Sequence, residues 1–368
     1  MKKAFALIAL FFLFHVSCGP KEAVVKVGIA GPMTGPQAKM GTDFRNGVNL
    51  AVEEWNEKGG VLGKKIIVLA GDDQADPKQA VSVANKLVNE GAVGIIGHFN
   101  SSASIPASDV YTRAGIPMIS PASTNPLFTD RLLKGVFRVC GRDDRQGTVA
   151  GDFVLKELKI KRIAIIHDKT TYGQGLANEF KKRLGNAVET VYYGGIVQGD
   201  KDFKMVLTAI KAKRPDLVYF GGIYPEAGLL VRQARELGMA VPFMGGDGVI
   251  DRKFIEIAGP AAAEGTFITF GPDPANIPAA KAFIEKYQKR FGDPGPYSIY
   301  AYDAVNVLLT AIKEAGTTEG GPVIERLHGL EFPGATGAIK FDAKGDVTKA
   351  PYIVWITKGG DFKEYWRP

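Results

Sequence analysis

Short apolar runs of strand length alternate with longer segments whose apolar residues recur at helical spacing. In the first part of the chain the predicted strands are 24–30, 65–70, 93–97 and 116–120. Between the first two strands lies the clearest amphipathic helix, whose apolar face consists of Phe44, Val48, Ala51, Val52 and Trp55. Asp76 and Pro77 mark the start of a second helix, because aspartate caps helix N-termini and proline suits the first helical position.

The same alternation begins again after a loop near Arg142. The second set of predicted strands is 162–167, 190–196, 216–220, 243–245 and 265–270, with helices at 175–184, 203–213 and 226–238. Two helices then follow without an intervening strand, at 279–291 and 299–315. The closing stretch 337–355 alternates as strands around the turn Ala-Lys-Gly-Asp.

Regular strand–helix alternation predicts an α/β protein with parallel sheets covered by helices on both faces. Because two such sets occur, we expect two doubly wound lobes rather than one long sheet. The late helices have no sheet of their own and must pack on one that is already formed. We therefore predict lobe 1 at 24–141, completed by 272–350, and lobe 2 at 142–271, completed by 351–368, with several crossing segments that form a hinge.

The first 17 residues are predicted to be an export signal rather than part of the fold. Lys2 and Lys3 form a basic start, and 4–13 is an apolar stretch too short to span a membrane. The following Ser-Cys-Gly resembles the lipobox of bacterial lipoproteins, in which the cysteine, here Cys18, is acylated and becomes the mature N-terminus. His15 stands where that motif usually has leucine. The alternative is an ordinary signal peptide cleaved nearby, and both readings predict an exported protein.

Composition and charge narrow the class of protein further. Acylation of Cys18 would leave Cys140 without a partner, so no internal disulfide is expected, and two domains of ordinary size bury sufficient cores without one. The formal net charge is +7, but the basic residues are interspersed and are not interleaved with aromatics. This pattern is typical of a mixed solvated surface and argues against nucleic-acid binding. Beyond the leader, no run of 18 apolar residues predicts a membrane-spanning helix.

A hydroxyl-rich segment follows the strand 93–97. Ser101, Ser102 and Ser104 lie where a helix begins, and a helix N-terminus offers unpaired N–H groups and the positive end of the helix dipole. Such a site suits a small anion such as a carboxylate. Capping of the helix by these serines explains the same pattern without a ligand.

Other strand ends carry polar residues in the same way. Ser123 and Thr124 follow one predicted strand, Tyr172 follows another, and Asp247 follows a third. Ligands of open parallel sheets bind beyond the carboxyl ends of the strands. Hydroxyls and a helix N-terminus suit a carboxylate, whereas Asp247 suits an ammonium group. Together these residues predict a site for a zwitterion between the lobes, with capping and turn formation as the alternative.

No constellation of residues predicts an enzyme. His98, His167 and His328 lie in unrelated segments, and no metal-ligand spacing occurs. Ser101 lacks the Gly-x-Ser-x-Gly context of a nucleophile elbow, and Gly-Gly-Val-Leu-Gly-Lys-Lys falls short of a phosphate-binding loop. We therefore expect no catalysis, no metal and no cofactor.

Several motifs in collinear order carry a family resemblance. They are KVGIAGPMTGPQAKMGTD, NEKGGVLGKK, DDQADPKQAVSVANKLV, GIIGHFNSSAS, RIAIIHDKTTYGQGLA and FMGGDGV. From residue 24 to residue 355 the chain is similar to the periplasmic leucine/isoleucine/valine-binding proteins, the receptor subunits of ABC importers for branched-chain amino acids. The resemblance implies the type I periplasmic-binding fold, in which two lobes joined by three crossing strands close on an amino acid.

The resemblance also implies a role for each site residue. Ser101 matches the family's carboxylate-binding serine. The backbone carbonyl of Ala122 would accept the ligand's ammonium group, and Thr124 would contact both its carboxylate and its ammonium. Tyr172 would reach in from the second lobe. Asp247 stands where the best-known members have an ammonium-binding glutamate, which is longer by one methylene.

The side-chain pocket is expected to be mainly apolar. Its predicted walls, by the same resemblance, are Met40, Phe99, Asn100, Ile223 and Tyr297, with Tyr224 as a candidate to turn inward in place of a missing aromatic. An apolar wall favours aliphatic ligand side chains, because a charged one would be desolvated without a partner. Family members often have aromatics where Met40 and Ile223 stand, which keeps an aromatic amino acid, a small amide and a γ-amino acid as alternative ligands.

These observations predict a function in solute uptake. We expect a monomeric, periplasmic solute receptor of an ABC importer that binds leucine, isoleucine or valine by hinge closure and delivers it to the permease subunits. Acylation at Cys18 would anchor it to a membrane. A ligand sensor on the same fold is the alternative from another class of protein.

Overall fold

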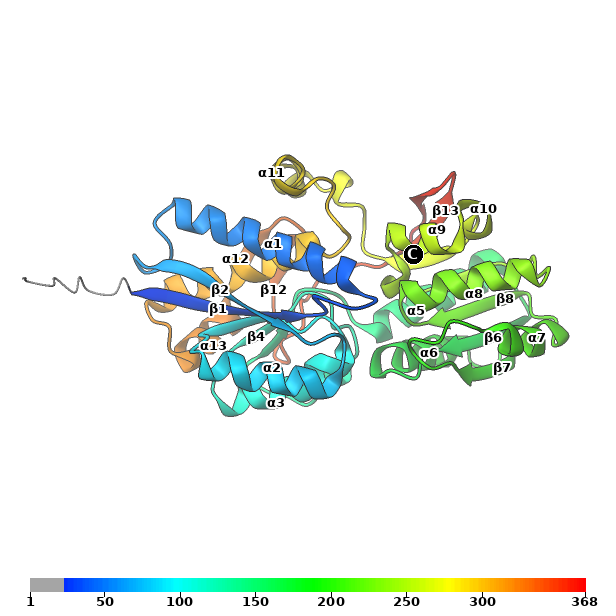
Figure 1. Ribbon diagram of the computed structural model, residues 1–368, viewed down its shortest axis with the longest axis horizontal. Helices are drawn as coiled ribbons and strands as arrows, with labels where there is room; N and C mark the ends of the chain where they lie inside the picture. Colours follow the sequence, from blue (N-terminus) through cyan, green and yellow to red (C-terminus); the bar gives the residue numbers. More distant parts are fainter. Residues whose placement is uncertain (1–22) are drawn as a thin grey trace, which may run out of the picture.

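Two large β-sheets organise the chain in the computed structural model, which describes residues 23–368 (Figure 1). The first sheet is parallel throughout and has the order β2-β1-β3-β4-β5. Its strands are β1 (Val24–Gly31), β2 (Lys65–Asp72), β3 (Gly94–Gly97), β4 (Met118–Ser120) and β5 (Val136–Arg138). A strand order that starts inside the sheet and grows towards both edges is that of a doubly wound fold.

Helices cover both faces of this first sheet (Figure 1). The main ones are α1 (Ala38–Glu57), α2 (Pro77–Asn89), α3 (Ser101–Arg113) and α12 (Ser298–Ala315). α1 packs against α12 on one face, and α2 packs against α3 on the other. Gly47 allows the first contact, because a Cβ there would lie 2.2 Å from the backbone oxygen of Ser298. The smaller elements of this lobe are α4 (Leu127–Asp130), α11 (Lys281–Phe291), α13 (Gly320–Gly329), β11 (Glu331–Gly334) and β12 (Gly337–Lys340).

The second sheet has seven strands in the order β14-β13-β10-β9-β8-β6-β7. They are β6 (Arg162–His167), β7 (Glu189–Gly195), β8 (Leu217–Gly221), β9 (Phe243–Gly245), β10 (Phe267–Phe270), β13 (Ile353–Lys358) and β14 (Asp361–Trp366). The last two run antiparallel to their neighbours, so this sheet is parallel from β10 to β7 and antiparallel at its other edge. The helices of this lobe are α5 (Asp143–Phe153), α6 (Thr171–Leu184), α7 (Lys204–Ala212), α8 (Tyr224–Glu236), α9 (Arg252–Ala258) and α10 (Pro260–Ala263).

The chain passes between the two sheets three times. The first passage joins β5 to α5, the second leads from β10 to α11, and the third leads from β12 to β13. Three crossing segments let two lobes rotate relative to each other while each sheet stays intact. The predicted α/β class, with two doubly wound lobes and a three-segment hinge, is confirmed. The residue boundaries given above for the two lobes stay a prediction.

A buried ion pair fixes a late segment of the chain to the first sheet. Asp346, which follows β12, accepts hydrogen bonds from Arg138 Nε at 2.6 Å and from Arg142 Nη1 at 2.7 Å. Thr129 Oγ1 donates to the same carboxylate at 2.8 Å. Because Arg138 ends β5, this network holds the segment after β12 against the edge of the first sheet.

Glycines explain why the sequence pattern missed α5. A Cβ at Gly147 would lie 2.7 Å from the backbone of Glu179, and one at Gly151 would lie 2.4 Å from the side chain of Arg183. Both neighbours belong to α6, so the two helices pack closely without the apolar periodicity that predicts a helix. The other elements that were not predicted are α4, α9, α10, α13, β5, β11 and β14.

The strands of the closing stretch do not pair with each other across the turn Ala-Lys-Gly-Asp. β12 pairs with β11, whereas β13 pairs with β10 and β14. Within residues 23–368 a single bridge, between Phe341 and Val347, spans the turn. The remaining predicted strands and helices are present with shifted ends, and Asp76 caps α2 by accepting from the backbone N–H groups of Lys78 and Gln79.

Candidate functional site

Four predicted ligand residues lie at the carboxyl ends of strands in both lobes. Ser101 opens α3 after β3, and Thr124 follows β4 in the first lobe. Tyr172 lies in the first turn of α6 after β6, and Asp247 follows β9 in the second lobe. All four residues are buried, with at most 7% of their surface exposed. This is the edge of an open α/β sheet at which ligands bind.

Asp247 is held by a tyrosine hydroxyl from each lobe. Tyr172 donates to Asp247 Oδ1 at 2.6 Å, and Tyr297 donates to Oδ2 at 2.6 Å. Tyr172 also accepts from the backbone N–H of Gly248 at 2.9 Å, which fixes its hydroxyl. Tyr297 immediately precedes α12 of the first lobe, so its bond to Asp247 joins the two lobes.

Burial dominates the electrostatics of this carboxyl group. Removal from water raises the pKa of Asp247, and the hydroxyls of Tyr172 and Tyr297 offset only part of that effect. The pKa values of both tyrosines are raised, first by their own burial and then by the charge of Asp247. A buried carboxylate that is hydrogen-bonded but not paired with a cation favours binding of a positive group.

The first-lobe side of the site consists of hydroxyls and backbone groups. Ser101 Oγ accepts from the backbone N–H of Asn125 at 3.2 Å. The hydroxyl of Thr124 is buried and has no hydrogen-bond partner within residues 23–368. Ala122 lies between them in sequence and is also buried. A free hydroxyl beside a helix N-terminus suits an anionic group that brings its own acceptors.

The serines of α3 do not cap their helix. Its N-cap residue is Asn100, and no side chain makes a cap hydrogen bond there. Ser104, which capping would assign to the helix end, instead lies 2.6 Å from Ser123, oxygen to oxygen. The capping interpretation of this hydroxyl cluster is therefore wrong, and the N-terminal N–H groups of α3 keep the capacity to bind an anion.

The predicted wall residues are buried and come from both lobes. They are Met40, Phe99, Asn100, Ile223, Tyr224 and Tyr297. The rings of Phe99 and Tyr297 meet edge to face, with centroids 4.9 Å apart. Asn100 donates its amide to Gln37 Oε1 at 2.9 Å, while its own Oδ1 has no partner in the described part of the chain. The Tyr224 hydroxyl donates to the backbone oxygen of Pro36 at 2.7 Å and so connects the lobes.

A further hydrogen bond shows that the lobes are closed on each other. Asn125, after β4, donates to the backbone oxygen of Thr171 at the start of α6, at 2.7 Å. The bonds from Tyr297 and Tyr224 cross the same boundary. The structure therefore represents a conformation in which residues of both lobes surround the candidate site.

Two residues of this site were missed by the sequence interpretation. Asp143 and Gln146 belong to α5 and are both fully buried. Gln146 Nε2 donates to the backbone oxygen of Thr269 at 3.0 Å, and the amide also lowers the pKa of Asp247. The available signal was the pair of aspartates after the loop at Arg142, with a glutamine one turn further on.

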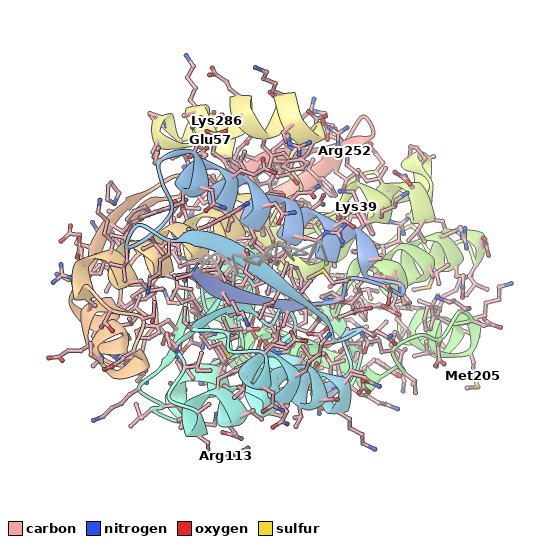
Figure 2. All side chains as sticks on the ribbon, turned by 60° about the vertical axis from the view of Figure 1, so that its left-hand side comes forward. Lys39, Glu57, Arg113, Met205, Arg252 and Lys286 are labelled. Carbon is pink, nitrogen blue, oxygen red and sulfur yellow. The ribbon has the colours of Figure 1, made fainter. Side chains whose placement is uncertain are left out.

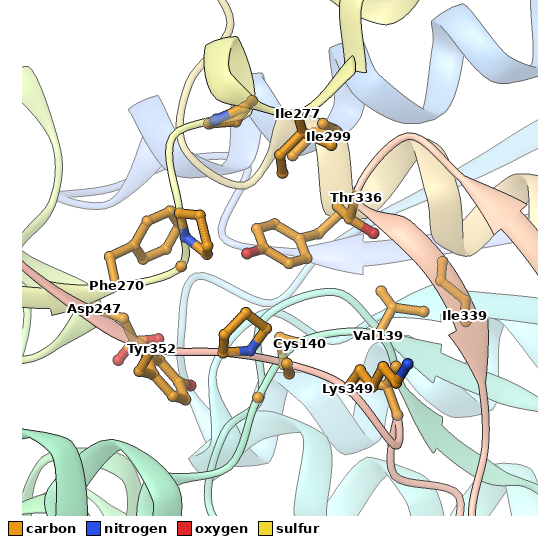
Figure 3. Close-up of a pocket in the computed structure, with 18 of the residues that line it drawn as sticks. Val139, Cys140, Asp247, Phe270, Ile277, Ile299, Thr336, Ile339, Lys349 and Tyr352 are labelled. Atoms are coloured by element: carbon orange, nitrogen blue, oxygen red, sulfur yellow. The ribbon is translucent and has the colours of Figure 1, made fainter. Parts of the chain in front are cut away.

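Two cavities lie beside this cluster. One of about 320 Å³ is lined mostly by the crossing segments, including Cys140, Phe270 and Tyr352, and touches the site at Asp247 (Figure 3). The other, of about 410 Å³, lies between the lobes, and Lys39 of α1 and Arg252 of α9 are among the residues that line it (Figure 2). Neither cavity is lined by Ser101 or Thr124.

His98 belongs to the buried core of the first lobe and not to the candidate site. Nδ1 of His98 lies 2.7 Å from Asp73 Oδ2 and its Nε2 lies 3.0 Å from the Tyr111 hydroxyl, all in the buried core. In residues 23–368 no group of three or more His, Cys, Asp or Glu side chains is arranged to hold a metal ion. Over the same residues no helix is long and apolar enough to cross a membrane.

Comparison with known proteins agrees with the fold. The family model of periplasmic binding proteins matches residues 24–361. The Leu/Ile/Val-binding protein homolog 2 of Brucella abortus is 43% identical over 349 residues, which cover 94% of each chain. A leucine-binding protein, LivK, from Thermotoga maritima superimposes with a TM-score of 0.87 at 33% identity, covering 94% of this chain and 99% of that one. The substrate-binding protein LivJ from Streptococcus pneumoniae, solved with isoleucine, superimposes with a TM-score of 0.86 at 29% identity, covering 93% and 100%.

The chain belongs to the periplasmic binding protein family. This confirms the resemblance to the leucine/isoleucine/valine-binding proteins and the type I periplasmic-binding fold. The protein is accordingly an extracytoplasmic protein that binds small-molecule solutes. Its activity is binding rather than catalysis. The predicted leader at 1–17 and Cys18 lie outside the described residues.

Proposed function

We propose that this protein is the solute receptor of an ABC importer and binds leucine, isoleucine or valine between its lobes. The observation that carries the proposal is the buried carboxylate of Asp247, which receives one tyrosine hydroxyl from each lobe and has no cationic partner at its oxygens within residues 23–368. An α-ammonium group supplies the missing charge. Relatives named for binding these three amino acids, and a neighbour solved with isoleucine, support the choice of ligand.

The opposite end of the ligand binds the first lobe. Ser101 and the N-terminal N–H groups of α3 receive the α-carboxylate, because the dipole and the unpaired donors both favour an anion. The hydroxyl of Thr124, which has no partner within residues 23–368, bridges the ligand's carboxylate and ammonium groups. The backbone carbonyl of Ala122 accepts a further ammonium N–H, and Tyr172 orients Asp247 from the second lobe.

The side-chain pocket selects aliphatic ligands. Met40, Phe99 and Ile223 offer apolar surface, and Tyr297 closes the wall against Phe99. Each methylene buried there contributes about 0.8 kcal/mol. The Tyr224 hydroxyl donates to the backbone oxygen of Pro36, so the ring of Tyr224 is a further apolar surface at the lobe boundary.

Ligand binding works by closing the lobes. Only the closed conformation lets Asp247 and Tyr172 of one lobe and Ser101 and Thr124 of the other contact the same small molecule. The ligand therefore shifts the population towards the closed form, through its differential affinity for the two states. The permease subunits of the importer recognise that closed form, in which the protein is a monomer anchored to a membrane through acylated Cys18.

Calorimetry against all common amino acids tests this proposal. The mature chain, produced without its lipid, is titrated with the twenty L-amino acids, γ-aminobutyrate and acetamide. We expect leucine, isoleucine and valine to bind at least tenfold more tightly than the rest, since one or two methylenes in an apolar pocket are worth about 1–3 kcal/mol. An aromatic amino acid, γ-aminobutyrate or acetamide as the tightest ligand would overturn the branched-chain assignment. Mass spectrometry of the mature N-terminus tests the acylation of Cys18.

A further inference from the structure

Asp143 is a buried carboxyl group without a structural role that explains it. It is the first residue of α5, directly after the first crossing segment, and 0% of it is exposed. Its backbone N–H donates to the backbone oxygen of Thr124 at 2.9 Å, so its position is fixed against the first-lobe side of the site. Neither carboxyl oxygen has a hydrogen-bond partner within residues 23–368. Leaving such a group unsatisfied is costly, and buried polar groups are normally paired.

Other unpartnered polar atoms lie around the same point. Thr124 Oγ1 and Gln146 Oε1 are both buried and lack partners in the described chain. The Thr124 hydroxyl lies close enough to Asp143 to lower its pKa, although outside hydrogen-bonding geometry. A Cβ at Gly246 would lie 2.9 Å from the Tyr172 hydroxyl and 3.6 Å from Gln146 Nε2, which places Gln146 beside the residue before Asp247. The side chain of Gln146 therefore adjoins Asp247, and the Thr124 hydroxyl adjoins Asp143.

The charges around Asp143 do not neutralise it. Burial, and then the negative charge of Asp247, raise the pKa of Asp143 well above its usual value. The nearest cation is Arg138, which directs its donors to Asp346 Oδ1, the Ser123 backbone oxygen and the Thr129 hydroxyl. The other ionisable groups that interact electrostatically with Asp143 are Asp144, Cys140, Tyr172, Tyr219 and Tyr352. None of them carries a positive charge.

We propose that Asp143 is a second carboxylate for the ligand's ammonium group, and that Asp143, Gln146 and Thr124 together with Asp247 make that ammonium obligatory. A primary ammonium has three N–H donors and one positive charge, which match several orphaned acceptors and the uncompensated charge of this cluster. Water can satisfy the acceptors but supplies no charge. A ligand with the same side chain and carboxylate but no amino group leaves two interacting buried carboxyl groups without a cation, so the site rejects it.

This inference rests on the proposed function only for the choice of test ligand. L-Leucine and its des-amino counterpart, 4-methylpentanoate, form the matched pair. If leucine does not bind, the tightest amino acid of the panel and its own des-amino acid take their place. A different amino acid as best ligand contradicts the branched-chain assignment and leaves the role of Asp143 intact.

The test is calorimetry at pH 7 on the mature wild-type chain and on Asp143→Asn, with Asp144→Asn as the control. Asp144 is the adjacent residue, but its carboxylate points to Arg142 at the surface. We expect wild type and Asp144→Asn to bind leucine alike and to show no binding of 4-methylpentanoate. Asp143→Asn should bind leucine at least tenfold more weakly, and its preference for leucine over 4-methylpentanoate should shrink.

A second readout separates a binding role from a structural one. Asparagine removes a buried, unpaired carboxyl group, so ligand-free Asp143→Asn should melt at the same temperature as wild type or higher, whereas loss of a structural acid would lower the melting temperature. Asp143→Ser repeats the test with a smaller side chain if the asparagine variant does not fold. Leucine affinity in Asp143→Asn equal to that of wild type, or wild-type binding of 4-methylpentanoate as tight as that of leucine, would overturn the proposal.

Discussion

Two buried aspartates near the first crossing segment differ in their partners and therefore in their roles. Asp346 is 4% exposed and accepts from Arg138, Arg142 and Thr129. Asp143 is 0% exposed and its oxygens have no partner in residues 23–368. Burial is the same, but only Asp346 is neutralised by the fold. Removing one partner of a buried ion pair destabilises a fold, whereas a buried carboxyl group without any partner is itself costly, and for Asp143 we assign that cost to ligand binding.

Removing the paired carboxylate should have the largest effect, and the effect should be on stability. Asp346→Asn leaves buried Arg138 and half-buried Arg142 without their shared anion, so the free energy of unfolding should fall by about 3–5 kcal/mol. Urea unfolding followed by circular dichroism measures this. Leucine affinity of the folded protein should stay within threefold of wild type, because Asp346 lies outside the site.

The control for this variant is Asp361→Asn. Asp361 pairs with Arg252 at 3.7 Å, and both side chains are exposed. Its loss should change the free energy of unfolding by less than about 1 kcal/mol. If Asp346→Asn were no less stable than Asp361→Asn, the distinction between paired and unpaired acids would be wrong.

Removing a partner from Asp247 should make that residue resemble Asp143 and should weaken binding. Tyr297→Phe deletes the hydroxyl that reaches Asp247 from the first lobe. Hydrogen bonds to charged groups are worth about 1.5–3 kcal/mol, so leucine should bind roughly tenfold to a hundredfold more weakly in calorimetry. Tyr300→Phe, one turn away and without a hydrogen bond to Asp247, should bind as wild type does. Equal losses in both variants would contradict a specific role for Tyr297.

Asp168 is only partly paired, and so is intermediate between Asp346 and Asp143. Its effect on the free energy of unfolding should be smaller and should depend on pH. Oδ1 accepts from Thr170, but Oδ2 has no partner in the described residues. Burial raises the pKa of Asp168 to about 6. Because this pKa is higher in the folded than in the unfolded chain, the folded state binds the extra proton between about pH 4 and pH 6. The free energy of unfolding should therefore gain about 1 kcal/mol from this residue as the pH falls from 7 to 5.

Urea titrations at pH 5, 6 and 7 measure that contribution. Asp168→Asn cannot take up the proton, so its stability should lack the gain that wild type shows. Asp200→Asn, at an exposed loop position, should show the same change of the free energy of unfolding with pH as wild type. If the free energy of unfolding of Asp168→Asn changed with pH as that of wild type does, the pKa of Asp168 would not be the cause, and the account of this partly paired carboxyl would be wrong.

The sequence predicted the parts of this molecule that follow from periodicity and strand ends. Ser101, Thr124, Tyr172 and Asp247 all follow apolar strands, and the common edge of parallel strands made their approach predictable. The sequence pattern did not predict α5, because Gly147 and Gly151, rather than apolar residues, form its contact with α6.

The difference between the two aspartates could not be predicted in the same way. Asp143 and Asp346 both stand in polar segments of the sequence, and nothing local distinguishes them. The partners of Asp346 come from residues 129, 138 and 142, far away along the chain. Pairing of a buried charge is a property of the tertiary structure, so the unpaired acid of the site became visible only there.

Leucine binding to Asp247→Ala tests the central claim most directly. Asp247 is the predicted ammonium-binding acid, with its oxygens held by tyrosines of both lobes. Calorimetry should detect no leucine binding to this variant, at protein concentrations where wild type binds, while its far-UV circular dichroism stays that of wild type. Unchanged leucine affinity in a folded Asp247→Ala protein would contradict the account.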